Sequence, residues 1–288
     1  MMKKTVYQII NDRIIEMLEA GTPPWRKAWA GGGGLPINFK SKKAYRGINT
    51  LMLAFAGFES PTWLTFKQAK EAGGCVKKGE KSTPVIFWNW IYKDANGRRV
   101  KDAALATSKV PFLRYYNVFN VAQCEGVIDP YQPAVDHDHE PIEEAVKLVE
   151  NMPNAPTIQH DEARAYYRPA TDTVNMPRLG LFDGPEEYHS TLFHELVHST
   201  GHESRLNRQA SDKPRSFGSE DYSKEELVAE MGAAMLCGVV GIDSTIENSA
   251  AYIQSWIKVL KGDPEMAVKA GAQAQRAADH IQGVVWDK

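Results

Sequence analysis

The stretch EEYHSTLFHELVHST, residues 186–200, decides the fold of the second half of this 288-residue chain. Pro185 stands where the first turn of a helix tolerates proline, and apolar residues recur along the stretch, so the pattern predicts a helix here. His194 and His198 are four residues apart, and positions i and i+4 lie on one face of a helix. The helix therefore presents two imidazoles side by side.

Two imidazoles at this spacing can bind one metal ion. Glu195 projects beside them and can accept a proton from a water on that ion, which is the arrangement of zinc peptidases. A catalytic zinc usually has three protein ligands and one open position, so a third ligand is needed. In the metzincin pattern HExxHxxGxxH this ligand would be a histidine at position 204. The chain has Ser204 there, which excludes the metzincin arrangement.

The next predicted helix, residues 223–240, offers the third ligand. Glu226 precedes a run of small residues, 232–234, which lets two helices approach closely enough for a carboxylate to reach the ion. Glu230 lies one turn further along the same face and suits a hydrogen bond to the free nitrogen of a histidine ligand. We predict Glu226 as the ligand and Glu230 as its neighbour outside the ligand shell. The reverse assignment and His202 as the ligand stay open, as does an acidic face that is merely solvated.

Charge divides the chain into two unlike halves, although its net charge is only -2. Residues 1–128 hold 20 Lys and Arg against 9 Asp and Glu, and the remainder holds 14 against 27. The first half also holds 17 of the 28 aromatic residues. Cationic grooves and stacking aromatic rings bind single-stranded nucleic acid, so the first half is predicted to bind single-stranded DNA. No base-reading pattern is visible, which predicts binding without sequence specificity.

The candidate DNA contacts are basic and aromatic residues of this first half. They are Lys40, Lys42, Lys43, Tyr45, Arg46, Trp63, Lys77, Lys78, Lys81, Trp88 and Trp90. Trp88 and Trp90 share one face of a predicted strand, residues 84–92, which an Asn-Gly turn joins to a second strand, residues 110–119. The alternative for this tryptophan face is burial in a core.

These patterns predict an α+β protein of two domains. Residues 1–128 form an α+β domain with an antiparallel sheet, residues 129–140 a linker, and residues 141–288 a mostly helical domain. The three cysteines are far apart and odd in number, which argues against a disulfide framework. No stretch approaches the roughly 20 apolar residues of a membrane span, and we see no signal peptide. We therefore expect a cytoplasmic protein with no membrane partner.

Longer stretches around these motifs resemble one family. HELVHSTGHESRLNR, residues 194–208, is similar to the signature of the ArdC-type antirestriction proteins of plasmids and phages. The run ELVAE, residues 226–230, resembles the third-ligand helix of gluzincin-type peptidases. YRGINTLML, residues 45–53, and SPTWLTFKQAKEAGGCVKKGEKSTPVIFW, residues 60–88, resemble the single-stranded-DNA-binding domain of the antirestriction family.

The resemblance covers nearly the whole chain. It implies a zincin-like C-terminal domain of the gluzincin type that holds Zn²⁺ or another divalent metal. It also implies a role in protecting entering plasmid DNA from host restriction.

Three functions fit these observations. The first is a metallopeptidase tethered to DNA, with restriction-system proteins as its substrates or targets. The second is a non-catalytic protein that occludes single-stranded DNA and whose metal site is structural. Glu195 weighs against this second function, because a structural site needs no general base. A metal-dependent nuclease is a weaker third, because HExxH sites suit carbonyl attack and the acidic half offers no basic cleft.

Overall fold

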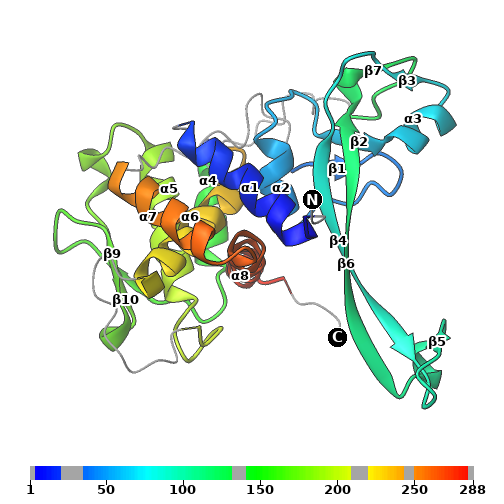
Figure 1. Cartoon of the computed structure of the whole chain (residues 1–288). Helices are drawn as coiled ribbons and strands as arrows, with labels where there is room; N and C mark the ends of the chain where they lie inside the picture. The colour runs from blue at the N-terminus through cyan, green and yellow to red at the C-terminus, as the bar shows by residue number, and fades with distance from the viewer. Residues whose placement is uncertain (1–3, 21–34, 132–140, 209–219, 243–249, 285–288) are drawn as a thin grey trace.

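The computed structural model describes residues 4–20, 35–131, 141–208, 220–242 and 250–284. It shows a helical body with a β-sheet on one side, which confirms the α+β class (Figure 1). The helices are α1 (Val6–Glu19), α2 (Ile48–Ala54), α3 (Phe66–Glu71), α4 (Pro141–Glu150), α5 (Pro185–Ser199), α6 (Glu220–Val240), α7 (Ala250–Gly262) and α8 (Met266–Ile281). The strands are β1 (Ile37–Asn38), β2 (Thr62–Thr65), β3 (Cys75–Val76), β4 (Thr83–Lys93), β5 (Arg99–Val100), β6 (Ser108–Asn120), β7 (Cys124–Glu125), β8 (Thr157–Gln159), β9 (Tyr166–Arg168) and β10 (Thr173–Asn175).

The main sheet lies in the first half and has the order β1-β2-β6-β4-β5. Its longest pairing is the antiparallel hairpin of β4 and β6, which runs in register from Thr83 opposite Val118 to Lys93 opposite Ser108. Only the base of this hairpin packs on the rest of the protein, and its outer part projects as an arm (Figure 1). A smaller sheet of order β8-β10-β9 lies in the second half, beside α5.

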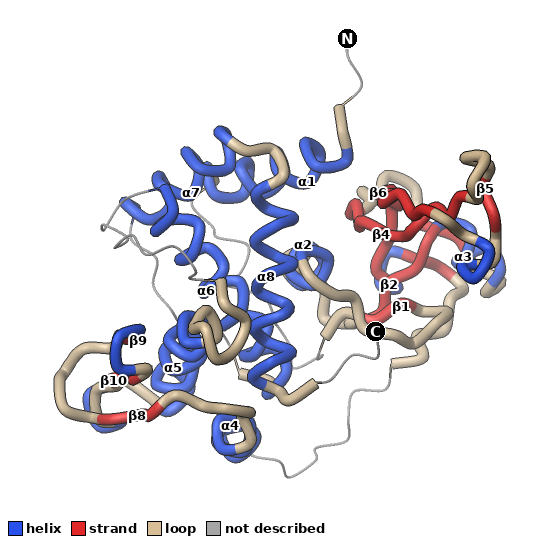
Figure 2. Tube along the Cα trace, turned by 90° about the horizontal axis from the view of Figure 1, so that it is seen from below, coloured by secondary structure: helices blue, strands red, loops and turns tan. Residues whose placement is uncertain are grey.

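One hydrophobic core joins the two halves. Ile10 and Ile14 of α1 and Ile48 and Leu51 of α2 belong to the same buried cluster as the apolar residues of α5, α6, α7 and α8. Figure 2 shows α8 in the middle of this helical body, with α1 and α2 beside it. The domain boundary at residue 128 stays a prediction, but one hydrophobic core contains residues from both sides of it.

Close contacts fix this joint between the halves. A Cβ added to Gly271 of α8 would lie 2.9 Å from the backbone nitrogen of Ile48, so glycine is what allows α8 to approach α2. The Asn49 amide then holds the hairpin, because it donates to the Ile86 carbonyl at 2.8 Å and accepts from the Ile86 backbone N–H at 2.7 Å.

Two further points concern the predicted organisation. Most of the predicted linker, residues 132–140, lies outside the described residues. Among the helices that the structure describes, none combines the length and apolar character that a membrane span requires.

Candidate metal centre

Helix α5 carries the HELVH motif. It starts after Gly184 with Pro185 in its first turn and two glutamates behind it, which suits the positive end of the helix dipole. Phe193, Leu196 and Val197 are buried and hold the helix against the body. His194 and His198 therefore share the face that is turned toward α6.

Helix α6 lies against this face at short range. A Cβ added to Gly232 would lie 2.7 Å from the Cγ2 of Val197, so the small residue predicted to permit a close approach does so. The acidic residues of α6 thus come within reach of the imidazoles. Among the described residues, His194, His198 and Glu226 form a group that could bind a metal ion. Each side chain offers one ligand atom, and these atoms lie within 4.8 Å of one another.

The three side chains form a small triangle of donor atoms. The Nε2 atoms of His194 and His198 are 3.1 Å apart. The Glu226 carboxylate lies 3.5 Å from the His194 Nε2 through one oxygen and 3.4 Å from the His198 Nε2 through the other. Ligand atoms at ~2.0–2.1 Å from a tetrahedral ion are ~3.3 Å apart, so this donor set fits a divalent metal such as zinc.

The charges around the imidazoles favour a cation as well. Burial lowers the pKa of His198, but its contacts with Glu225 and Glu226 outweigh burial and raise that pKa to about 10. Burial also lowers the pKa of His194, but Glu226, Glu230 and Glu195 together outweigh burial, so the pKa of His194 is raised too. The acids stabilise positive charge between the helices, and a metal ion that binds there releases protons from the imidazoles.

Two further glutamates of α6 lie behind the imidazoles. Glu230 is 3.6 Å from the Nδ1 of His194, and Glu225 is 3.7 Å from the Nδ1 of His198. Carboxylates in these places orient a histidine ligand and increase its basicity. The position of Glu230 agrees with its predicted role, although that role stays a prediction. Glu225 was missed in the sequence, because only the packing of α5 on α6 shows that it faces a histidine.

Arg208, the last residue of the HELVHSTGHESRLNR stretch, contacts Glu225. Arg208 donates to Glu225 at 2.8 Å and to the carbonyl of Val197 at 2.8 Å. It thereby fixes the carboxylate that faces His198 and ties it to the end of α5. The sequence signal for this contact is the arginine itself, but its partner lies on another helix.

We expect the Arg208→Ala and Glu225→Gln variants to bind Mn²⁺ or Zn²⁺ about 10- to 100-fold more weakly, the usual cost of losing a partner of a ligand. Isothermal titration calorimetry measures this. Glu220→Gln is the matched control, because Glu220 lies exposed at the start of the same helix and pairs with Lys224 instead. Equal affinities for all three variants and the wild type would contradict the role of Glu225.

Two other predicted participants lie differently. His202 follows the end of α5, and its Nδ1 contacts the Ser204 hydroxyl at 2.8 Å, outside the donor triangle. The geometry therefore favours Glu226 as the third ligand. Glu195 is buried beside the triangle, and its charge acts on both imidazoles.

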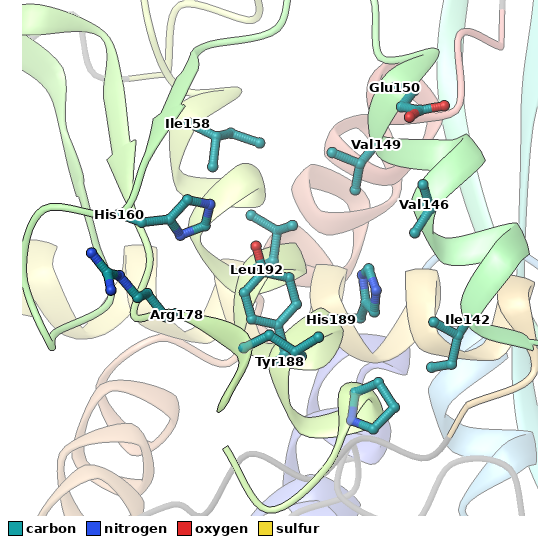
Figure 3. A pocket seen from close by; sticks show the side chains of 12 residues that line it. Ile142, Val146, Val149, Glu150, Ile158, His160, Arg178, Tyr188, His189 and Leu192 are labelled. Carbon is teal, nitrogen blue, oxygen red and sulfur yellow. The ribbon is translucent and has the colours of Figure 1, made fainter. Parts of the chain in front are cut away.

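A cleft of about 610 Å³ lies on another side of α5 (Figure 3). Its α5 wall is the stripe of Pro185, Tyr188, His189 and Leu192, and helix α4 supplies the opposite apolar wall. At about 100° per residue, His194 is turned away from His189 and Leu192 by ~140–200° around the helix axis. The cleft is therefore separate from the donor triangle.

Some of the candidate DNA contacts are exposed in the structure, and others are buried. Trp88 and Trp90 are 48% and 37% exposed, with ring centroids 6.2 Å apart, and the ammonium of Lys109 lies 4.8 Å from the Trp90 ring centre. The prediction for Trp63 is wrong as a stacking site. Its side chain is 1% exposed and packs with Leu53, Val85 and Val118, so it presents no ring face to a base.

The two candidates just before α2, Tyr45 and Arg46, also make contacts within the protein. Tyr45 is half-buried, and its hydroxyl accepts from the Asn38 amide at 3.1 Å. Arg46 forms an ion pair with Asp279 of α8 at 2.5 Å, so it joins the two halves. Both side chains thus have partners within the protein, although Arg46 is 43% exposed, and their role in DNA binding stays a prediction.

The candidate lysines are exposed, although two of them form an ion pair or a hydrogen bond within the protein and Lys42 lies 4.8 Å from the Phe39 ring centre. Lys40 pairs with Glu71 at 3.1 Å, and Lys77 donates to the Ala122 carbonyl at 2.9 Å. The exposed lysines of the set are Lys40, Lys42, Lys43, Lys77, Lys78 and Lys81. Their role in DNA binding stays a prediction.

Comparison with known families and structures covers both halves. Residues 143–273 match the zincin-like metallopeptidase family, and residues 4–119 match the N-terminal domain of anti-restriction factor ArdC. The chain is similar to the antirestriction ArdC protein of plasmid R388. The metal-free structure of that protein shows 37% identity and a TM-score of 0.77, over 97% of each chain. Its Mn(II)-bound structure shows 36% identity and a TM-score of 0.76, over 97% of this chain and 98% of that one.

Relatives known by sequence fall into two kinds. The uncharacterized protein y4eC of Sinorhizobium fredii is 33% identical over 283 residues, which is 95% of this chain and 90% of that protein. Two DNA primases TraC of Escherichia coli are 36% and 37% identical over 97% of this chain. The chain spans only 20% and 27% of the length of these primases.

Proposed function

Since the chain belongs to the ArdC antirestriction family and carries a zincin-like domain with a divalent-metal site, we propose that it binds single-stranded DNA without sequence specificity and hydrolyses peptide bonds at that site. The two activities together protect incoming plasmid DNA from host restriction. Their place of action is the cytoplasm, and the targets are proteins of the restriction system. The observation that carries the proposal is the donor triangle of His194, His198 and Glu226 with Glu195 beside it.

The side chains of the site divide the work of peptide hydrolysis. His194, His198 and Glu226 would hold the ion, while Glu225 and Glu230 keep the imidazoles in orientation. A divalent ion held there supplies Lewis acidity and lowers the pKa of a water molecule. The Glu195 carboxylate accepts the proton of the attacking water and passes it to the leaving amine. Burial of Glu195 keeps bulk water from screening its charge.

The Glu195→Gln variant tests the hydrolysis. It retains the metal donors and loses the proton acceptor, so peptide hydrolysis should fall by about 10²- to 10⁴-fold. Purified restriction-endonuclease subunits are the substrate to assay. Protection is measured as transfer of unmodified plasmid into a restricting host. Glu203→Gln, an exposed glutamate past the end of α5, is the matched control.

The outcome separates the proposed peptidase from a DNA-occluding protein. We expect Glu195→Gln to bind metal and DNA like the wild type and to lose protection. If this variant protects as well as the wild type, the peptidase proposal is wrong and occlusion of the DNA accounts for protection.

The DNA-binding proposal rests on the exposed tryptophans of the arm. Each base stacked on an aromatic ring is worth ~1–3 kcal/mol, so the double variant Trp88→Ala, Trp90→Ala should bind a dT oligonucleotide at least about tenfold more weakly. Fluorescence anisotropy measures this on the full chain. Phe66→Ala is the matched control, because Phe66 is an exposed aromatic of α3 that also has a lysine, Lys70, above its ring at 5.2 Å.

Salt dependence provides a second readout of the same proposal. Contacts between basic residues and phosphates release counterions, so the wild-type affinity should fall steeply as salt rises. Affinity that does not change with salt would contradict a cationic DNA surface. Equal losses in the Phe66 and tryptophan variants would contradict the role of the arm.

A further inference from the structure

The hairpin of β4 and β6 has two open faces beyond its base. Cross-strand partners share a face, and neighbours along a strand alternate between faces. The register pairs Trp88 with Leu113 and Phe87 with Arg114. The first face therefore carries Trp88, Trp90, Lys109 and Tyr115, and the second face carries Phe87, Phe112, Arg114 and Tyr116.

The second face repeats the chemistry of the first. Phe87 and Tyr116 are 47% and 44% exposed, and their ring centroids are 6.1 Å apart. The Arg114 guanidinium lies 4.5 Å from the Phe112 ring centre, as Lys109 lies over Trp90 on the other face. Each face thus offers exposed rings for stacking and a cation beside them.

Charge indicates what these faces bind. The strands β4 and β6 contain Lys93, Lys109 and Arg114, and neither strand contains an aspartate or a glutamate. Exposed rings with interleaved cations and no acid suit a chain of bases and phosphates. A protein surface as partner would have to supply acidic side chains to both faces alike.

The base of the arm holds both faces in place. On the first face Ile86 packs against the helical core, and on the second face Val85 lies in the core cluster of Trp63 and Val118. From Phe87 to Lys93 the free part of β4 extends over ~20 Å at about 3.3 Å per residue. The backbone of the ribbon separates the faces along this length, so one strand lying on a face does not reach the other.

We propose that the two faces bind two nucleic-acid strands at once, so that the preferred ligand is a forked DNA whose two single-stranded branches pass on either side of the arm. The inference rests on the proposed binding of single-stranded DNA and names its ligand more closely. The second face is the new site, and its stacking residues are Phe87 and Tyr116, with Arg114 as the phosphate contact.

The test compares two labelled ligands on the full chain by fluorescence anisotropy: a dT single strand, and a duplex with two dT branches of that length. A fork joins both strands, so the second contact is intramolecular, and the wild type should bind it about tenfold or more tightly than the single strand. The double variant Phe87→Ala, Tyr116→Ala should keep single-strand binding within about twofold of the wild type, since the first face, with its larger tryptophan rings, dominates the binding of a lone strand, and it should lose the preference for the fork.

Further variants and outcomes make the test decisive. Arg114→Gln leaves all rings in place and should also reduce the preference for the fork. A wild type without that preference, or second-face variants that retain it, would overturn the inference. A wild-type dimer in sedimentation that these variants dissociate would overturn it too, because a second copy would then cover this face. If Trp88→Ala, Trp90→Ala binds single strands like the wild type, the proposed function itself fails.

Discussion

The His198→Ala variant should bind Mn²⁺ or Zn²⁺ at least ~100-fold more weakly than the wild type, because it removes one of three protein donors of the ion. The Nε2 of His198 lies 3.1 Å from that of His194 and 3.4 Å from Glu226, so His198 supplies one corner of the donor triangle. Competition with a chelating dye measures the affinity. Circular dichroism establishes that the variant is folded.

The matched control is His202→Ala, which removes a histidine four residues further along. Its ring contacts Ser204 and lies outside the donor triangle, so metal affinity should remain that of the wild type. Glu226→Gln should resemble His198→Ala, whereas Glu230→Gln should lose only about 10- to 100-fold. A larger loss in Glu230→Gln than in Glu226→Gln would reverse the assignment of the third ligand.

The Arg205→Ala variant should lower the free energy of unfolding by ~2–5 kcal/mol, because it breaks a partly buried ion pair and the hydrogen bonds of a buried guanidinium. The side chain of Arg205 is fully buried and pairs with Asp172. It also donates to the carbonyls of Ser199 at 2.8 Å and Asn154 at 2.9 Å. One guanidinium thus joins the end of α5, a loop and the small sheet, and its removal leaves the partly buried Asp172 carboxylate without its cation.

Urea denaturation followed by circular dichroism measures this loss. The control is Arg168→Ala, because Arg168 is exposed and lies over the Tyr166 ring at 5.1 Å. A surface change of this kind should alter the free energy of unfolding by no more than ~0.5 kcal/mol. Similar losses for the two arginines would show that Asp172 does not depend on its buried partner.

Local spacing made the motif of α5 predictable. Two histidines at i and i+4 face the same way on any helix, and the helix itself follows from the proline, the acids and the apolar periodicity of one short stretch. The position of Glu226 was harder to predict, because its approach to the histidines depends on the packing of a second helix. The small residue Gly232 gave that signal, and the structure places it against Val197.

Contacts between distant segments could not be predicted from the sequence. Glu225 and Arg208 are 17 residues apart and meet only because α6 folds back on α5. Likewise, aromatic and basic composition does not distinguish an exposed ring from a buried one. Trp63 and Trp88 both lie on strands of the same sheet, but Trp63 is under α2 and Trp88 is on the projecting arm. Arg46 has the charge of a DNA contact and is used between the halves.

The core shared by α1, α2 and α8 affects how the chain matures on the ribosome. Helix α1 ends at Glu19, and the residues of α8 that cover it are complete only about 260 residues later. At ~5–20 residues per second, the apolar face of α1 waits ~13–50 s for its partner, and that of α2 waits ~11–45 s. The nascent first half is thus a natural client of chaperones that bind exposed apolar helices. Among the helices that the structure describes, α8 is synthesised last, and it completes the core of the first half.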